Sequence, residues 1–94
     1  MKVIGLGKVY KFMAIHTDAK KWLTAWVAEA KSANWTKPLD IKHRYSSASI
    51  LADNCVIFNV KGHSYRMEIQ VAYKTGHVFI KRLGTHAEYE RWRH

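Results

Sequence analysis

Basic and amide side chains recur at strand spacing in the second half of the chain, and they are the first candidates for chemistry. They are Asn59, Lys61, Arg66 and Lys81. Side chains along a β-strand point alternately to opposite faces, so one antiparallel sheet would place all four on the face opposite its apolar positions. Ammonium, guanidinium and amide groups donate hydrogen bonds to anions. We therefore expect this sheet face to bind an anion.

A histidine and a tyrosine follow at the start of an expected helix. In the segment Gly84-Thr85-His86-Ala87-Glu88, the threonine and the glutamate have the spacing of a capping box. His86 would lie in the first helical turn, with Tyr89 near it at the end of the sheet. A helix N-terminus attracts phosphate, and histidine, with an ordinary pKa of about 6.5, gives or takes a proton near neutral pH. A capping box alone marks only a helix start, but its place beside the basic sheet face makes this region the candidate site.

Three strands must hold these groups in place. Alternating apolar and polar residues predict the strands at 56–61, 65–73 and 78–83. Gly62 and His63 fit a two-residue hairpin turn, because glycine supplies the positive φ of the first turn position. In the third strand the same alternation places Lys81 and Leu83 together on the polar face. The expected sheet thus has one apolar face and one polar face.

Two helices are expected in front of these strands. The first lies within 8–16, after a short strand at Val3-Ile4, and the second follows Thr17 or Asp18 as its N-cap. An apolar stripe runs along the second helix at four-residue intervals, through Trp22, Trp26 and Ala30. Aromatic residues in such a stripe form core far more often than they stack on a ligand. We therefore expect the helices to gather on one side of the sheet.

The connector between the helices and the sheet shows little periodicity. Pro38 fits the first turn of a short helix that ends near Tyr45, and a loop is expected at 46–49. Lys42 and Arg44 make the connector basic. It could contact RNA or a partner chain, but a merely solvated segment explains these charges equally well.

Composition bounds the class of protein. The chain has 94 residues, enough for one small domain, which we place at 1–94. Sixteen Lys and Arg residues against seven Asp and Glu give a formal net charge of +9, which favours polyanions, acidic partners or anionic surfaces. The lone Cys55 cannot form an internal disulfide, as is typical of a reducing cytosol. Because the sequence shows neither a membrane-spanning stretch nor a signal-peptide pattern, we expect a cytoplasmic protein.

Histidines elsewhere in the chain show no metal-ligand spacing. They are His16, His43, His77 and His94. Zinc sites draw on closely spaced His and Cys ligands, which this sequence does not offer. We therefore expect neither a metal nor a cofactor. His63, in the expected turn, is interpreted as a surface histidine.

The order of the expected elements defines a fold class. A strand, two helices and a connector precede a three-stranded meander and a final helix. This order predicts an α+β fold, with a mainly antiparallel sheet of about four strands, two N-terminal helices packed on one face and a short C-terminal helix.

Several runs of the sequence together carry a family resemblance. They are Ile57-Phe58-Asn59-Val60-Lys61-Gly62 with Tyr65-Arg66, the later Gly84-Thr85-His86-Ala87-Glu88-Tyr89, and upstream Trp35, Pro38, Asp40-Ile41-Lys42 and Tyr45-Ser46-Ser47-Ala48-Ser49-Ile50-Leu51. In these runs the chain resembles the HigB family of type II toxin–antitoxin toxins. The resemblance implies a RelE-like domain and an mRNA interferase, a ribonuclease that degrades messages, often on the ribosome. It also implies a HigA-type helix-turn-helix antitoxin as partner, with promoter DNA bound mainly through that antitoxin.

Metal-independent RNA cleavage of this kind uses the neighbouring 2′-hydroxyl as nucleophile. The enzyme must take a proton from that hydroxyl, stabilise the charge on phosphorus and protonate the 5′-leaving oxygen. We expect Arg66 and Lys61 to hold the phosphate and His86 to serve as general base or acid. Tyr89 would orient the substrate or assist proton transfer, and Asn59 would fix a phosphate or a base. The expected products carry a 2′,3′-cyclic phosphate and a 5′-hydroxyl.

Two residues depart from the pattern of the family. Lys81 stands where related sequences commonly have arginine, and Arg82 stands where they commonly have an apolar aromatic residue. Lysine keeps the charge but loses bidentate geometry. Either Lys81 acts as a weaker contact to RNA, or Arg82 bends round to replace it.

A second class of function uses the same residues without catalysis. In this reading the chain is an RNA-binding or antitoxin-binding module whose basic face grips its partner. Such a module would bind RNA in a salt-sensitive way and leave the strand intact.

Overall fold

The computed structural model describes residues 1–92, so His94 and the end of the expected domain lie outside the described residues. Its strands are β1 (Lys2–Ile4), β2 (Ser49–Ile50), β3 (Cys55–Val60), β4 (Tyr65–Ala72) and β5 (His77–Thr85). Its helices are α1 (Leu6–Ile15), α2 (Lys20–Ser32), α3 (Pro38–Arg44) and α4 (His86–Glu90), with a 3₁₀ turn, η1 (Thr17–Ala19), before α2.

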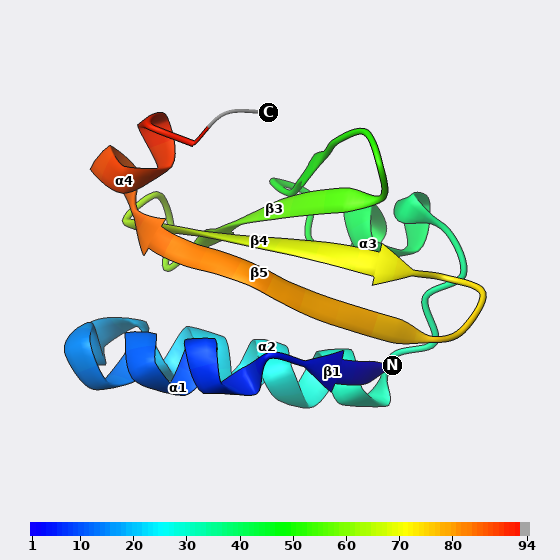
Figure 1. The fold of residues 1–94 in the computed structure, drawn as a ribbon, viewed down its shortest axis with the longest axis horizontal. Coiled ribbons are helices and arrows are strands. Elements are labelled where there is room, and N and C mark those ends of the chain that lie inside the picture. Colours follow the sequence, from blue (N-terminus) through cyan, green and yellow to red (C-terminus); the bar gives the residue numbers. More distant parts are fainter. Residues whose placement is uncertain (93–94) are drawn as a thin grey trace.

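The sheet and the helices form an α+β fold, as predicted. Within residues 1–92 the sheet has five strands in the order β1-β5-β4-β3-β2. Helices α1 and α2 lie side by side under one face, and α4 lies over the opposite side where β5 ends (Figure 1). Strand β1 pairs in parallel with β5, and the other pairs are antiparallel. None of the helices in this part of the chain is long and apolar enough to cross a membrane.

The expected number of strands was too low by one. Ser49 and Ile50 fall partly in the predicted loop, but they pair with Ile57 and Val56 as a two-residue edge strand. A strand of two residues is too short to show an alternating pattern, so the sequence gives no signal for it.

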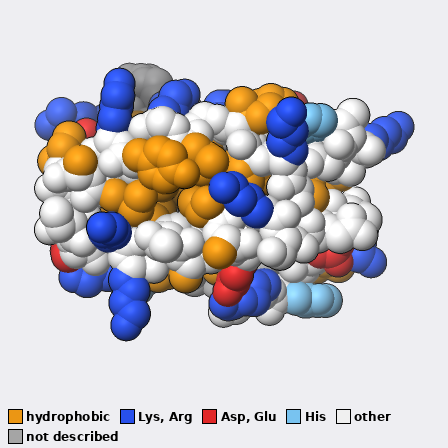
Figure 2. Space-filling view, turned by 90° about the horizontal axis from the view of Figure 1, so that it is seen from below, with side chains coloured by type: hydrophobic (Ala, Val, Ile, Leu, Met, Phe, Trp, Pro, Cys, Tyr) orange, Lys and Arg blue, Asp and Glu red, His pale blue; other side chains and the backbone are white. Residues whose placement is uncertain are grey.

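The face covered by α1 and α2 carries the core. In the apolar stripe of α2, Trp26 and Ala30 are buried as expected and Trp22 is partly buried. Trp26 meets Phe58 of β3 with ring centroids 5.4 Å apart. Both side chains are 1% exposed. The outer side of these helices shows hydrophobic side chains among Lys and Arg side chains (Figure 2). Positive charge is therefore not confined to the polar face of the sheet, and charge alone does not locate a site.

The loop between β3 and β4 differs from the expected two-residue turn. Val60 pairs with Tyr65, so the loop has the four residues 61–64. Lys61 and Gly62 have φ angles of 51° and 66°, in the left-handed region that glycine adopts readily and other residues rarely do. Lys61 therefore leaves the strand, and the alternation that put its side chain beside Arg66 ends one residue earlier.

Strand β5 contains a bulge that the sequence pattern did not reveal. Ile69 pairs with Ile80 but Glu68 pairs with Arg82, so Lys81 is an extra residue in β5. A bulge shifts the alternation of the residues that follow it. Arg82 consequently meets Glu68 on the polar face, whereas Leu83 packs against the core. The expectation that Leu83 lies on the polar face was wrong for this reason.

Candidate functional site

Arg66 lies on the polar face of the middle strand β4, near the end of the sheet that α4 covers. The residue is 8% exposed, and its Nη1 donates to the carbonyl oxygens of His63 at 2.9 Å and Tyr65 at 3.1 Å. Its guanidinium carbon lies 5.1 Å from the ring centroid of Tyr89. The carbonyl bonds fix the plane of the guanidinium and the aromatic ring covers it. The predicted pair Arg66 and Tyr89 is thus brought together.

His86 begins α4 beside this pair. Its ring centroid is 6.4 Å from that of Tyr89, and its Nε2 lies 3.0 Å from Oε1 of Glu90. The imidazole is 53% exposed, so a substrate can reach it. The backbone N–H of His86 donates to the carbonyl of Ser64 at 3.3 Å, which ties the start of α4 to the β3–β4 loop. Imidazole, phenol and guanidinium therefore share one end of the sheet.

The predicted capping box fixes the direction in which α4 leaves the sheet. Thr85 Oγ1 accepts from the N–H of Glu88 at 3.2 Å, and Glu88 Oε1 accepts from the N–H of Thr85 at 2.9 Å. These backbone and side-chain hydrogen bonds hold the pKa of Glu88 below its usual value. The carboxylate therefore stays ionised and keeps the helix start in place.

Asn59 and Lys61 have separated in the structure. Asn59 lies directly across from Arg66 in the β3–β4 pair and is half-buried, as the prediction of a shared face requires. Lys61 instead reaches η1, between α1 and α2, where its Nζ lies 3.0 Å from Oδ2 of Asp18. The expectation that Lys61 joins Arg66 on one face was wrong, because its left-handed backbone redirects the side chain.

Asp18 gathers a second polar cluster that sequence reasoning missed. Tyr65 donates its hydroxyl hydrogen to Asp18 Oδ1 at 2.6 Å, and the ring of His16 packs 5.0 Å from that of Tyr65. The hydrogen bond from Tyr65, followed by that from Lys61, lowers the pKa of Asp18. Neither Thr17 nor Asp18 caps α2 as expected, since Ala19 occupies the N-cap without a side-chain bond. The ring of Tyr65 packs against the core, and its hydroxyl finds in Asp18 the partner that the phenol of a partly buried tyrosine needs.

Lys81 lies on the polar face as expected, and the bulge brings Arg82 to the same face. Arg82 Nε donates to Oε1 of Glu68 at 2.7 Å, and Lys81 Nζ lies 3.8 Å from Oε2 of the same carboxylate. The Glu68 side chain is 3% exposed. On its other side, the guanidinium of Arg82 lies 4.5 Å from the ring centroid of Trp92. A pocket of about 290 Å³ adjoins these residues, lined by Leu51, Ala52, Asp53, Cys55, Glu68, Lys81 and Arg82.

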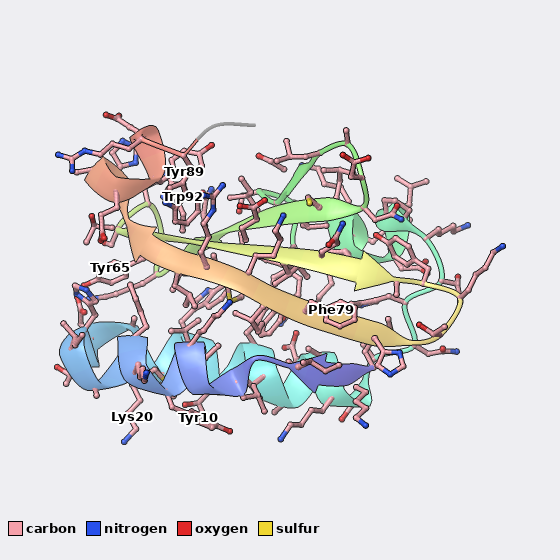
Figure 3. The ribbon with its side chains drawn as sticks, viewed as in Figure 1. Tyr10, Lys20, Tyr65, Phe79, Tyr89 and Trp92 are labelled. Carbon is pink, nitrogen blue, oxygen red and sulfur yellow. The ribbon has the colours of Figure 1, made fainter. Side chains whose placement is uncertain are left out.

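The aromatic residues show how the two clusters are arranged. Tyr89 and Trp92 lie over the end of the sheet next to α4, and Tyr65 lies below them, toward α1 and α2 (Figure 3). Tyr89 and Trp92 meet edge to face with centroids 5.5 Å apart. The Arg66 cluster, formed by Arg66, His86 and Tyr89, and the Asp18 cluster therefore lie on opposite sides of the same end of the sheet.

The basic residues of α3 lie apart from both clusters. Lys42 Nζ donates to the carbonyl of Ala48 at 2.6 Å, and Arg44 pairs with Glu29 of α2. Tyr45 also bonds Glu29, and its burial and this bond raise its pKa. Helix α3 lies toward the end of the sheet opposite to α4 (Figure 1). Lys42 and Arg44 thus support the local fold and do not adjoin Arg66 and His86.

The arrangement near α4 offers the groups that phosphodiester chemistry needs. A fixed guanidinium can stabilise a negatively charged phosphorane, and an exposed imidazole can transfer protons. Among the described residues, no three His, Cys, Asp or Glu side chains gather as they would around a metal ion.

The family model that matches this chain is HigB_toxin, described as the RelE-like toxic component of a toxin–antitoxin system, over residues 19–92. The matched segment begins just before α2 and contains β2 to β5 and α4. It therefore includes Arg66, His86 and Tyr89 and leaves out β1 and α1. Comparison with curated proteins gives no match.

Proposed function

Because the chain belongs to the HigB family of RelE-like toxins of toxin–antitoxin systems, we propose that it is an endoribonuclease that cleaves mRNA through the 2′-hydroxyl. The observation that carries the proposal is the cluster at the start of α4. There Tyr89 covers the guanidinium of Arg66 at 5.1 Å, and exposed His86 adjoins Tyr89. These groups match the three tasks of the reaction, which are to remove a proton, to stabilise charge on phosphorus and to return a proton.

His86 takes the proton from the 2′-hydroxyl in this proposal. Oε1 of Glu90 lies 3.0 Å from Nε2, where its negative charge stabilises the imidazolium that forms. The imidazole accepts the proton as the 2′-oxygen attacks phosphorus. The P–O5′ bond breaks, leaving a 2′,3′-cyclic phosphate and a 5′-hydroxyl. The protonated imidazole or the Tyr89 phenol supplies the proton for the leaving oxygen.

Arg66 stabilises the phosphorane, and further groups hold the RNA. The ion pair between Lys61 and Asp18 joins two half-exposed side chains, and such pairs contribute little stability. A phosphate can therefore attract Lys61 away from Asp18 at little cost. Asn59 contacts a phosphate or a base from its place opposite Arg66. Of the two neighbours in β5, we assign Lys81 to phosphate, because Arg82 already pairs with Glu68 and Trp92.

Lys42 and Arg44 have no place in this cleavage site. Both already make contacts within the fold, to Ala48 and Glu29. Their contact with RNA stays a prediction, which would add affinity at the far end of the sheet.

A toxic component of such a system implies an antitoxin as partner. We propose that this antitoxin is of the HigA type with a helix-turn-helix domain and that promoter DNA is bound through it. The substrate is mRNA, cleaved on the ribosome in the cytoplasm. The formal charge of +9 favours both polyanionic RNA and an acidic antitoxin surface.

The proposal is tested by mapping new mRNA 5′-ends after induced expression of wild-type, Arg66→Ala and His86→Ala proteins at matched levels. Discrete new ends and arrested growth with the wild type, both lost in the variants, are expected. Ends that persist in both variants would keep the nuclease and refute the site. No new ends, with RNA or antitoxin binding retained, would favour the non-catalytic binding module.

A further inference from the structure

Glu68 places a carboxylate on the polar face of the sheet, almost out of reach of water. Its side chain is 3% exposed, between β3 and β5 in the middle of the sheet. Removing an ionised carboxylate from water is unfavourable unless charged partners meet it. Arg82 Nε at 2.7 Å and Lys81 Nζ at 3.8 Å are such partners. The bulge in β5 makes this possible, because it turns Arg82 to the same face as Lys81.

Arg82 links this carboxylate to the residues around α4. Its guanidinium lies 4.5 Å from the centroid of Trp92, whose ring meets Tyr89 at 5.5 Å. Tyr89 in turn covers Arg66 at 5.1 Å. An unbroken series of contacts thus runs from the buried carboxylate to the guanidinium that we propose acts on the phosphate.

Gly84 allows the series to close against the sheet. A Cβ at this position would come within 2.9 Å of Trp92 Cζ2 and 3.1 Å of Glu88 Cβ. A contact of 2.9 Å between carbon atoms forces a shift, so any other residue here would displace the ring of Trp92, and Glu88 would have to move by a few tenths of an ångström. The strand is therefore shaped to receive this tryptophan.

Helix α4 needs such support because it has little of its own. It spans five residues, and none of these five is buried. An isolated helix of this length is unstable in water, since most helical stability in proteins comes from tertiary packing. The capping box fixes the first turn, but the position of Tyr89 over Arg66 depends on what lies beside it.

We propose that Glu68 is a positioning residue: it orients Arg82 against Trp92 and thereby sets Tyr89 and His86 of α4 relative to Arg66. The inference rests on the proposed function for its catalytic consequence. Glu68 itself touches no reacting atom. Arg82 likewise touches no reacting atom and serves to position α4, whereas Lys81 contacts the RNA phosphate.

The proposal is tested with Glu68→Gln, which keeps the shape of the side chain and removes its charge. We expect backbone amides of 86–92 to exchange hydrogen faster than in the wild type, measured by mass spectrometry. The kcat for RNA cleavage should fall about 10- to 100-fold, as expected when a reacting group is displaced by about 1 Å. The Kd for an uncleavable RNA with 2′-deoxyribose at the cut site should change less than about twofold, because Lys81 and Lys61 remain.

Glu29→Gln is the matched control. This carboxylate also pairs with an arginine, Arg44, but it lies on α2, in the core-side layer. The substitution Glu29→Gln should alter neither amide exchange in 86–92 nor kcat. Equal exchange and equal kcat for wild type and Glu68→Gln would overturn the proposal. A rise in Kd that accounts for the whole loss of cleavage would overturn it too, since it would make Glu68 a binding determinant.

A second variant keeps the test decisive if Glu68→Gln fails to fold. The double variant Glu68→Val with Arg82→Phe replaces the ion pair by two apolar side chains and leaves no buried charge unpaired. The double variant should show slow amide exchange in 86–92, as in the wild type, and should cleave RNA within about tenfold of the wild-type rate. Arg82→Phe alone leaves the Glu68 carboxylate without its arginine, so its amides should exchange rapidly and its cleavage rate should stay about 10²-fold below wild type. A folded double variant that exchanges rapidly or cleaves no RNA would contradict positioning by contact. If wild type cleaves no RNA, the proposed function fails, and the exchange experiment still decides the role of Glu68.

Discussion

The two faces of the sheet are buried by different means. Apolar side chains close the face under α1 and α2, where Trp26 packs on Phe58. The other face is covered near α4 by aromatic rings placed over arginines, Tyr89 over Arg66 and Trp92 over Arg82. The first arrangement serves stability alone. The second holds charged groups in fixed positions, with Arg66 buried and the side chain of Arg82 partly exposed, which a core of apolar side chains does not do.

The largest effect should come from the core face. Phe58→Ala removes a ring that is 1% exposed, and we expect it to lower the free energy of unfolding by about 3–5 kcal/mol. Phe79→Ala is the matched change on the opposite face, where the ring is 38% exposed, and should cost less than about 1 kcal/mol. Urea denaturation of both variants measures the difference. Equal losses would mean that the two faces do not differ as the packing indicates.

On the polar face the expected effect is on activity. His86→Ala should lower the rate of RNA cleavage about 10²- to 10⁴-fold, the usual contribution of a general acid or base. Its side chain is 53% exposed, so the free energy of unfolding should change by no more than about 0.5 kcal/mol. His77→Ala, at the far end of β5, is the control and should leave cleavage unchanged. A large loss of stability in His86→Ala would make the residue structural.

Changes at Thr85 test whether the capping box sets the orientation of α4. Thr85→Ala removes the acceptor for the N–H of Glu88 and should cost about 1 kcal/mol. The rate of RNA cleavage should fall by more than the decrease in folded protein explains, because α4 carries both His86 and Tyr89. Thr85→Ser keeps the hydroxyl and should retain most of the activity. If Thr85→Ala were as active as Thr85→Ser, the orientation of α4 would be set by other contacts.

The smallest expected effect is the contribution of Asp18 to the stability of the protein at acidic pH. The hydrogen bonds from Tyr65 and Lys61 lower the pKa of Asp18 in the folded state. Its contribution to stability is therefore complete above the ordinary pKa of about 3.9 and is lost as the pH falls through the lowered folded-state value. Asp18→Asn should lose less stability between pH 5 and pH 2 than the wild type, as thermal unfolding at a series of pH values would show. Identical acid profiles would refute this role.

The same contrast explains what the sequence could and could not foretell. Val56, Phe58 and Val60 all lie in the core cluster, as expected for alternate residues of a strand, whose side chains share one face of the sheet. The spacing of Thr85 and Glu88 predicted the start of α4 because a capping box is local. Both predictions rest on patterns within one element, and both were confirmed.

What the sequence did not foretell depends on exceptions to those patterns. The left-handed backbone of Lys61 and the bulge at Lys81 each shift a side chain to another face, and neither has a periodic signal. The bond from Tyr65 to Asp18 joins residues far apart in the chain. The candidate site was therefore predicted in its α4 part, while the partners of Lys61 and Arg82 required the three-dimensional structure.

The most direct test of the central claim is a comparison of two messages that differ in one atom. Purified protein is mixed with ribosome-bound mRNA carrying either ribose or 2′-deoxyribose at the mapped cut site, and the ends are analysed. We predict cleavage of the ribose message to a 2′,3′-cyclic phosphate and a 5′-hydroxyl, with no cleavage of the deoxyribose message. Cleavage of both messages at the same rate would contradict the account, because the 2′-hydroxyl would then not be the nucleophile.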